Sequence, residues 1–206
     1  MTEILVLFAS DRGHTLRAAE AVADGAAAVP SARSRLLDVD HAEPSDLERA
    51  DGVLLGIPVR MGSAHWRIKR FTERICGPLW STDRCTGGVG AVFATCGGYG
   101  GAGGGGELAL LTGLATLAQL GLLLVPLPRG TAGFERGGLH WGPLLRTADD
   151  NFRPRALDTQ TLTVAQRHGA HVARVAAALE GRRSHFDLDC QSDPVPRLQD
   201  HRYEAK

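Results

Sequence analysis

The sequence predicts an α/β protein in which helices cover both faces of one parallel sheet. Two observations predict this class. Short apolar runs alternate along the chain with segments of helical periodicity, as in consecutive β–α–β units. The clearest of these runs are apolar at every residue, which is typical of strands buried on both faces. Five such runs, with no sixth, favour a doubly wound sheet of strand order 2-1-3-4-5.

The first strand and the first helix are the clearest pair. Residues 4–9 are a continuous apolar run, and residues 15–29 are rich in Ala. Leu16, Ala19 and Val22 recur at the spacing that places side chains on one face of a helix. A buried strand followed directly by an amphipathic helix is therefore expected at the start of the chain.

The remaining elements alternate in the same way. A partly polar strand at residues 34–39 suits a sheet edge. We then expect, in chain order, a short helix within 41–49, a strand at 53–57, a helix at 64–75, a strand at 89–95, a helix at 107–120, a strand at 122–127, an irregular segment at 128–157 and a helix at 160–180. Residues 1–181 are thus expected to form one domain, with a polar tail at 182–206.

Composition argues against several classes of function. Lys plus Arg total 23 and Asp plus Glu total 23, so the formal net charge is zero. This balance gives no net electrostatic attraction to nucleic acid. The longest apolar run, residues 120–127, is too short to cross a bilayer. No signal peptide is recognised and the four Cys lack metal-site or CxxC spacing, so we expect a cytoplasmic protein with no metal site. Arg67, Lys69, Arg70 and Arg74 are interpreted as a solvated helix face.

A candidate phosphate site lies between the first strand and the first helix. The N-terminus of a helix leaves N–H groups unpaired, and its dipole attracts an anion. Ser10 and Thr15 carry hydroxyl donors, and Gly13 allows the chain to pass close to a ligand. An ordinary turn in which a hydroxyl caps the helix is the alternative interpretation.

Two further loops are expected to meet this one. Residues 58–63 follow the third strand, and residues 96–106, of which eight are Gly, follow the fourth. In a sheet of order 2-1-3-4-5, the carboxyl ends of strands 1, 3 and 4 adjoin one ligand site. This convergence favours the phosphate interpretation over a simple helix cap.

Several motifs resemble those of the WrbA-type NAD(P)H:quinone oxidoreductases of the flavodoxin superfamily. Residues 56–62 (GIPVRMG) match the G-T-P-T-R-F-G loop of that family, and residues 77–80 (GPLW) match its later G-L-W. Further matches are residues 94–97, 116–121 and 136–142. The resemblance covers residues 2–180 in order, and it implies the flavodoxin-like fold.

The resemblance implies non-covalent FMN, reduced by hydride from NADH or NADPH and reoxidised by a quinone or related aromatic substrate. The FMN phosphate is expected at Ser10, Arg12, Gly13, His14 and Thr15. The flavin ring is expected beside Pro58, Val59, Arg60, Met61, Gly62, Thr95, Cys96, Gly97 and Gly98. The amides of Met61 and Gly62 are expected to donate to the pyrimidine edge of the ring. The family is tetrameric, so we expect a homotetramer, or else a homodimer, in which Trp80 closes over a neighbouring subunit's flavin.

Departures from the family pattern concern the side of the flavin that faces the acceptor. Met61 replaces an aromatic, Gln119 and Leu120 replace a His pair, and Arg129 replaces a second aromatic. We therefore interpret Trp80, Met61 and Arg129 as catalytic or acceptor-facing residues, and an acidic aromatic substrate as a hypothesis. A tailoring reductase of aromatic or polyketide metabolism and an electron-carrier flavodoxin are alternatives, although zero net charge is unusual for an acidic carrier.

Overall fold

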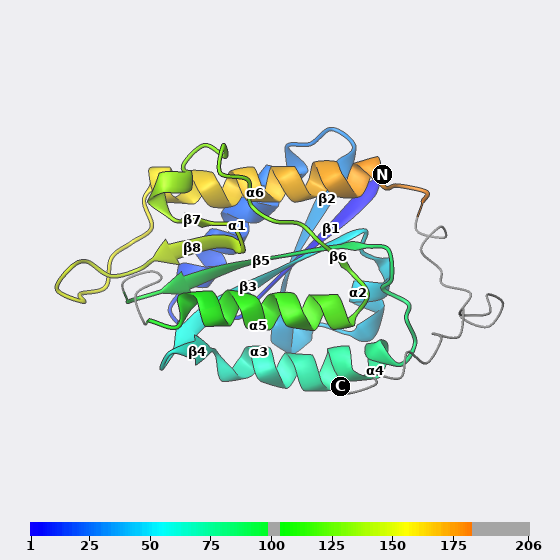
Figure 1. Cartoon of the computed structure of the whole chain (residues 1–206), viewed down its shortest axis with the longest axis horizontal. Coiled ribbons are helices and arrows are strands. Elements are labelled where there is room, and N and C mark those ends of the chain that lie inside the picture. Colours follow the sequence, from blue (N-terminus) through cyan, green and yellow to red (C-terminus); the bar gives the residue numbers. More distant parts are fainter. Residues whose placement is uncertain (99–103, 183–206) are drawn as a thin grey trace, which may run out of the picture.

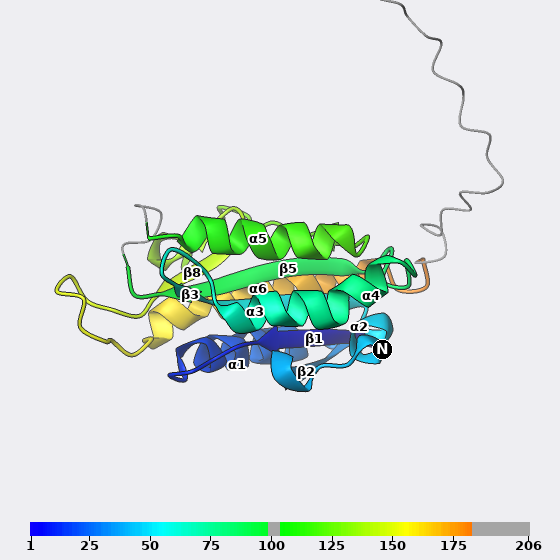
Figure 2. The ribbon, with the colours of Figure 1, turned by 90° about the horizontal axis from the view of Figure 1, so that it is seen from below.

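The structure, a computed structural model, describes residues 1–98 and 104–182, and its strands form one sheet with helices on both faces (Figures 1 and 2). The strand order is β2-β1-β3-β5-β8-β7, and all neighbours except β7 and β8 are parallel. The strands are β1 (Thr2–Phe8), β2 (Ala32–Asp38), β3 (Gly52–Arg60), β5 (Val89–Cys96), β7 (Gly138–Leu139) and β8 (Gly142–Arg146), with two-residue strands β4 (Ser63–Ala64) on β3 and β6 (Leu123–Leu124) on β5. The flavodoxin-like α/β class is confirmed.

The helices form two layers. Helices α1 (His14–Ala27) and α6 (Thr159–Ala178) cover one face, and Figure 1 shows α3 (Trp66–Phe71), α4 (Gly77–Trp80) and α5 (Gly106–Gln119) on the other. A short helix, α2 (Pro44–Arg49), precedes β3. Within the described residues, no helix combines the length and the apolar character needed to cross a membrane.

Side chains of β1 alternate between the two layers, which explains its continuous apolar run. Leu5 and Leu7 pack with α3 and α5, whereas Ile4 and Val6 pack with α1 and α6. All four are fully buried. The prediction that this strand is buried on both faces is therefore confirmed.

The fifth strand differs from the prediction. Only Leu123 and Leu124 of the expected strand at 122–127 pair with β5, at its amino end. Pro126 has no N–H to continue the ladder. The carboxyl half of β5 pairs instead with β8, which lies in the segment expected to be irregular. The position of the fifth strand is thus shared by two segments whose first residues, 123 and 142, are 19 residues apart.

The helix that begins near Ala64 also extends further than predicted. A π-helical turn at Thr72–Cys76 joins α3 to α4, so helical structure continues to Trp80 rather than ending near Ile75. Pro78 is tolerated because it lies in the first turn of α4. The other helices agree with the predictions to within a few residues. Residues 99–103 of the glycine-rich loop and residues 183–206 of the expected tail lie outside the described residues.

Candidate functional site

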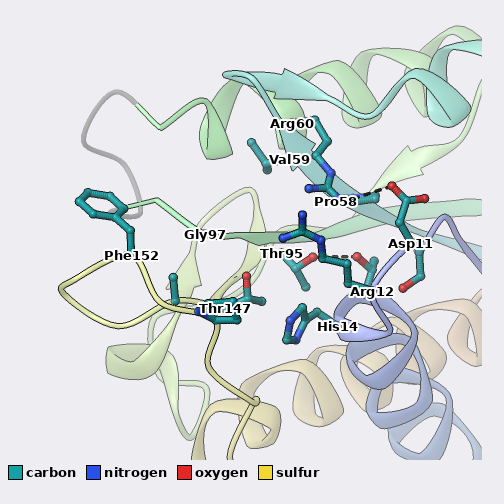
Figure 3. Close-up of a pocket in the computed structure, with 14 residues that line it drawn as sticks. Asp11, Arg12, His14, Pro58, Val59, Arg60, Thr95, Gly97, Thr147 and Phe152 are labelled. Carbon is teal, nitrogen blue, oxygen red and sulfur yellow. Dashed lines mark hydrogen bonds and ion pairs between the residues drawn. The ribbon is translucent and has the colours of Figure 1, made fainter.

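A pocket with a cavity of about 240 Å³ lies at the carboxyl ends of the parallel strands. The structure brings together the loops after β1, β3 and β5, as the sequence predicted, and adds the segment after β8 (Figure 3). The lining residues are Ser10, Asp11, Arg12, His14, Thr15, Pro58, Val59, Arg60, Thr95, Gly97, Thr147, Ala148, Phe152 and Pro154. The segment after β8 is the part of the wall that sequence reasoning missed.

The amino end of α1 is open toward this pocket. Gly13 precedes the helix with a φ of +81°, and no acceptor within residues 1–98 and 104–182 takes the N–H groups of Gly13, His14 or Thr15. The Leu16 N–H donates to Ser10 Oγ at 3.3 Å, which leaves the hydroxyl hydrogen of Ser10 for a ligand. These donors and the helix dipole together suit a phosphate dianion.

The hydroxyl of Thr15 has a structural partner that the sequence did not reveal. Its Oγ1 lies 2.7 Å from Oγ1 of Thr95, and both residues are buried. Because one hydrogen lies between the two oxygens, the pair together offers only one hydroxyl hydrogen to a ligand. The Thr15 hydroxyl is therefore less available to a ligand than expected. Its contact with Thr95 instead fixes α1 against the end of β5.

Asp11 connects two walls of the pocket. Its carboxylate lies 3.2 Å from Arg60 Nη2 and 2.9 Å from His65 Nε2, so it ties the loop after β1 to the loop after β3 (Figure 3). His65 is buried, and its Nδ1 faces the Arg67 N–H at 3.4 Å; Nε2 therefore carries the hydrogen. Arg12, in contrast, makes no ion pair within the described residues, so its charge is available to a ligand.

Arg67 supports the same loop from behind, contrary to the prediction of a solvated position. Its side chain is 13% exposed, its guanidinium contacts Asp38 and Asp40, and its Nη1 lies 3.4 Å from the Ser10 carbonyl oxygen. Burial opposes the charge, but hydrogen bonds and attraction from the two carboxylates outweigh it and raise the pKa of Arg67. Arg74, in contrast, is exposed as predicted, although its Nη2 donates to the carbonyl of Val39.

The carboxyl end of β3 lines the pocket, and the turn that follows it forms an exposed tip. Pro58, Val59 and Arg60 line the pocket. Met61 is fully exposed with a φ of +46°, Gly62 has a φ of +78°, and neither lines the cavity. The structure therefore does not place the Met61 side chain against the pocket, although its backbone lies at the tip of a lining loop.

The end of β5 contributes small residues. Thr95 and Gly97 line the pocket, whereas Gly98 is half-buried beside it and does not. Cys96 is buried, and burial raises the pKa of its thiol. This favours a space-filling role for Cys96 over a redox role. No cluster of metal-ligating side chains occurs in the described part of the chain.

Trp80 and Arg129 lie outside the pocket of this chain. Trp80 is 65% exposed, and Figure 1 shows α4 at the end of the sheet opposite β4. It lines a separate groove with Gln119 and Leu120, the positions where the family pattern has its His pair. Arg129 lines another surface hollow beside Phe134. The hypothesis of an acidic substrate that meets Arg129 at the pocket rim has no support within one chain.

Several known proteins that are similar over most of this chain carry the name NAD(P)H dehydrogenase (quinone). No family model matches the chain. The chain is 32% identical over 210 residues to NAD(P)H dehydrogenase (quinone) 3 of Rhizobium meliloti strain 1021, covering 90% of this chain and 97% of that protein. It is also 32% identical to NAD(P)H dehydrogenase (quinone) of Paracoccus denitrificans, covering 89% and 98%.

A solved structure agrees with these relatives. The WrbA-like flavodoxin of Agrobacterium tumefaciens superposes with a TM-score of 0.64 at 25% identity, covering 86% of this chain and 99% of that one. The order of the motifs, the open amino end of α1 and the extent of the matches all favour the same family. The chain therefore belongs to the NAD(P)H dehydrogenase (quinone) family, oxidoreductases of the flavodoxin-like fold.

Proposed function

We propose that the chain is an FMN-dependent oxidoreductase that transfers two electrons from NADH or NADPH to quinones. The observation that carries this proposal is the pocket itself, in which the amino end of α1 and Arg12 meet the ends of β3 and β5. A candidate phosphate site at one end and a wall of uncharged residues at the other, among them Gly97, Thr147 and Phe152, match an FMN molecule better than an inorganic anion. The names of the relatives supply the nicotinamide and the quinone.

The residues present fit the parts of FMN. The phosphate would be held by N–H groups of Gly13, His14 and Thr15, by the Ser10 hydroxyl and by Arg12. The ring would lie against Pro58–Arg60 and Thr95–Gly98, within reach of the Met61 and Gly62 amides. Bound FMN supplies hydride acceptance and two-electron transfer.

The side chains around the cofactor have separable roles. Arg12 balances phosphate charge, because it has no carboxylate partner in the described residues. Asp11 holds Arg60 and His65, so it orients the two loops rather than the ligand. Backbone donors at Met61 and Gly62 would stabilise negative charge on the pyrimidine edge of the ring without a dedicated acid.

The proposed enzyme is a homotetramer. Trp80 is exposed and lies far along the sheet from its own pocket, so it can meet a flavin only in another subunit. In that position its indole would cover the apolar ring and narrow the space for a flat acceptor.

The test begins with FMN titrated into the purified protein and followed by flavin fluorescence. We expect FMN to bind at least about tenfold more tightly than riboflavin, because only FMN engages the phosphate site. Inorganic phosphate should compete with FMN. Equal affinity for the two flavins would contradict the phosphate assignment.

The second stage adds NADH or NADPH without oxygen and then menadione. Loss of the oxidised-flavin absorbance on adding nicotinamide, and its return with menadione, would support quinone reduction. A bound flavin that ignores both nicotinamides would contradict the proposed enzyme and favour an electron carrier.

A further inference from the structure

A turn between β8 and α6 carries an aromatic side chain to the pocket. Phe152 lines the cavity, and its side chain is 64% exposed. Figure 3 shows it across the pocket from Asp11 and Arg12. This residue lies in the segment that was expected to be irregular, and no role was predicted for it.

Asp149 organises the turn. Its Oδ1 accepts the N–H groups of Asn151 and Arg153, each at 2.9 Å. Its backbone carbonyl accepts the Phe152 N–H at 3.1 Å, and its own N–H donates to the Arg153 carbonyl at 3.0 Å. Four bonds to one residue fix the path of the chain on both sides of Phe152.

The base of the turn is fixed to the sheet. The Thr147 N–H donates to the Cys96 carbonyl at 2.7 Å, and the Arg155 N–H donates to the Thr147 carbonyl at 2.8 Å. Arg146 Nη2 donates to the Asp149 carbonyl at 2.7 Å, and its Nη1 lies 2.8 Å from Asp150 Oδ1. The turn is therefore positioned by the end of β5, the strand whose loop also lines the pocket.

Phe152 occupies a backbone conformation that an aromatic residue rarely adopts. Its φ is +59°, in the left-handed region, which carries an energetic cost for a residue with a Cβ. Glycine would remove that cost, and the exposed ring gains little from burial here. A strained aromatic at a pocket wall suggests that its ring has a role in the site.

We propose that Phe152 forms one wall of the ring end of the pocket and stacks on the planar ring of a bound flavin. This inference rests on the proposed function. A phosphate held at Ser10–Thr15 directs the rest of the ligand away from α1, toward the wall where Phe152 and Gly97 lie. Phe152 is the sole Phe, Tyr or Trp among the described lining residues, so it supplies the aromatic face.

The experiment compares Phe152→Gly with wild type by titrating FMN and riboflavin separately. Loss of a stacking partner should weaken both flavins about three- to tenfold, because both carry the same ring. Competition by inorganic phosphate should not change. Thermal stability should stay the same or rise, because glycine suits the backbone at this position.

Three further variants separate stacking from folding. Phe152→Tyr keeps an aromatic face and should restore wild-type affinity, whereas Phe152→Leu keeps apolar bulk and should not. Asp83→Gly is the matched backbone control, since Asp83 also has a positive φ, +51°, and lies outside the pocket. It should leave both flavin affinities unchanged.

One result would overturn the inference while the proposed function stands: wild-type affinity of Phe152→Gly for both flavins. If that variant also had a raised KM for menadione, Phe152 would be assigned to the acceptor instead. Failure of the wild-type protein to bind FMN is a different outcome, and it would overturn the proposed function together with this inference.

Discussion

The pocket at the carboxyl ends of the strands and the groove around Trp80 at the other end are built differently. Loops from four strands form the pocket, and bonds within the chain, such as Asp11 to Arg60 and Thr15 to Thr95, fix them. The groove lies between helices, and Trp80 projects from it. One chain thus contains the features of a cofactor site, whereas a role for Trp80 in catalysis needs a second chain.

The largest expected effect is a loss of stability caused by a substitution at the pocket end of the molecule. Gly105 has a φ of +78°, and an added Cβ would lie 2.0 Å from the Gly62 carbonyl oxygen. Gly105→Ala must therefore strain the backbone and separate α5 from the loop after β3. We expect the free energy of unfolding to fall by about 3 kcal/mol.

Urea unfolding measures this change. Gly130→Ala is the matched control, because nothing lies within 4 Å of its added Cβ, and it should change stability little. A Gly105→Ala variant as stable as the control would show that the α5 end adapts without cost.

The next effect removes charge from the pocket without altering its walls. Arg12→Ala should weaken FMN binding about thirtyfold, because a hydrogen bond to a charged phosphate is lost. Riboflavin affinity should stay the same. Fluorescence titration measures both, and Arg129→Ala, a cation outside the pocket, should change neither. Equal loss in the two Arg variants would indicate a diffuse charge effect rather than a contact.

Acid should weaken the packing of α6, which covers one face of the sheet. His168 of α6 is fully buried, and burial, followed by repulsion from His171, lowers the pKa of His168 to about 3. In the unfolded chain His has a pKa near 6.5, so below that pH the unfolded state takes up a proton that the folded state refuses. The stabilisation is present above pH 6.5 and is lost as pH falls.

This linkage should cost about 1.4 kcal/mol at pH 5.5 relative to pH 8. Urea unfolding at the two pH values measures the cost, and His168→Leu should remove that part of the pH dependence. If both proteins respond equally to acid, His168 is not the group responsible. The flavin affinity of the folded protein should not depend on this substitution, because His168 does not line the pocket.

Local features of the sequence were sufficient to predict that the amino end of α1 opens toward the pocket. Ser10, Gly13 and the first turn of α1 are contiguous, so their arrangement follows from the strand–turn–helix pattern. The apolar run at 122–127 misled the strand assignment because Leu122 and Leu127 are buried without extending a ladder. Burial alone therefore did not determine which residues pair in the sheet.

Features that depend on distant partners were missed. Arg67 resembles a solvated helix residue until Asp38 and Asp40, which lie in another element, are brought against it. The Asp149 turn is local, but its place beside the pocket depends on β8 pairing with β5. A search for Asp followed by Asn in loops could have found the turn, though not its position.

The smallest expected effect comes from a substitution in the groove around Trp80. Trp80→Ala should not change FMN affinity in protein diluted to single chains, because Trp80 does not line the pocket of its own chain. In protein concentrated enough to assemble, the same variant should lower menadione turnover. Analytical sedimentation at the protein concentration of each assay measures whether the chains are assembled.

Trp66→Ala is the matched control, since Trp66 is also exposed, at the start of α3 rather than in α4. It should leave assembly and turnover unchanged. A loss of FMN affinity in single chains of Trp80→Ala would contradict the separation of the two regions, because it would mean that the groove acts on the pocket through the chain. Loss confined to the assembled protein would instead identify the subunit contact as the feature that completes the site.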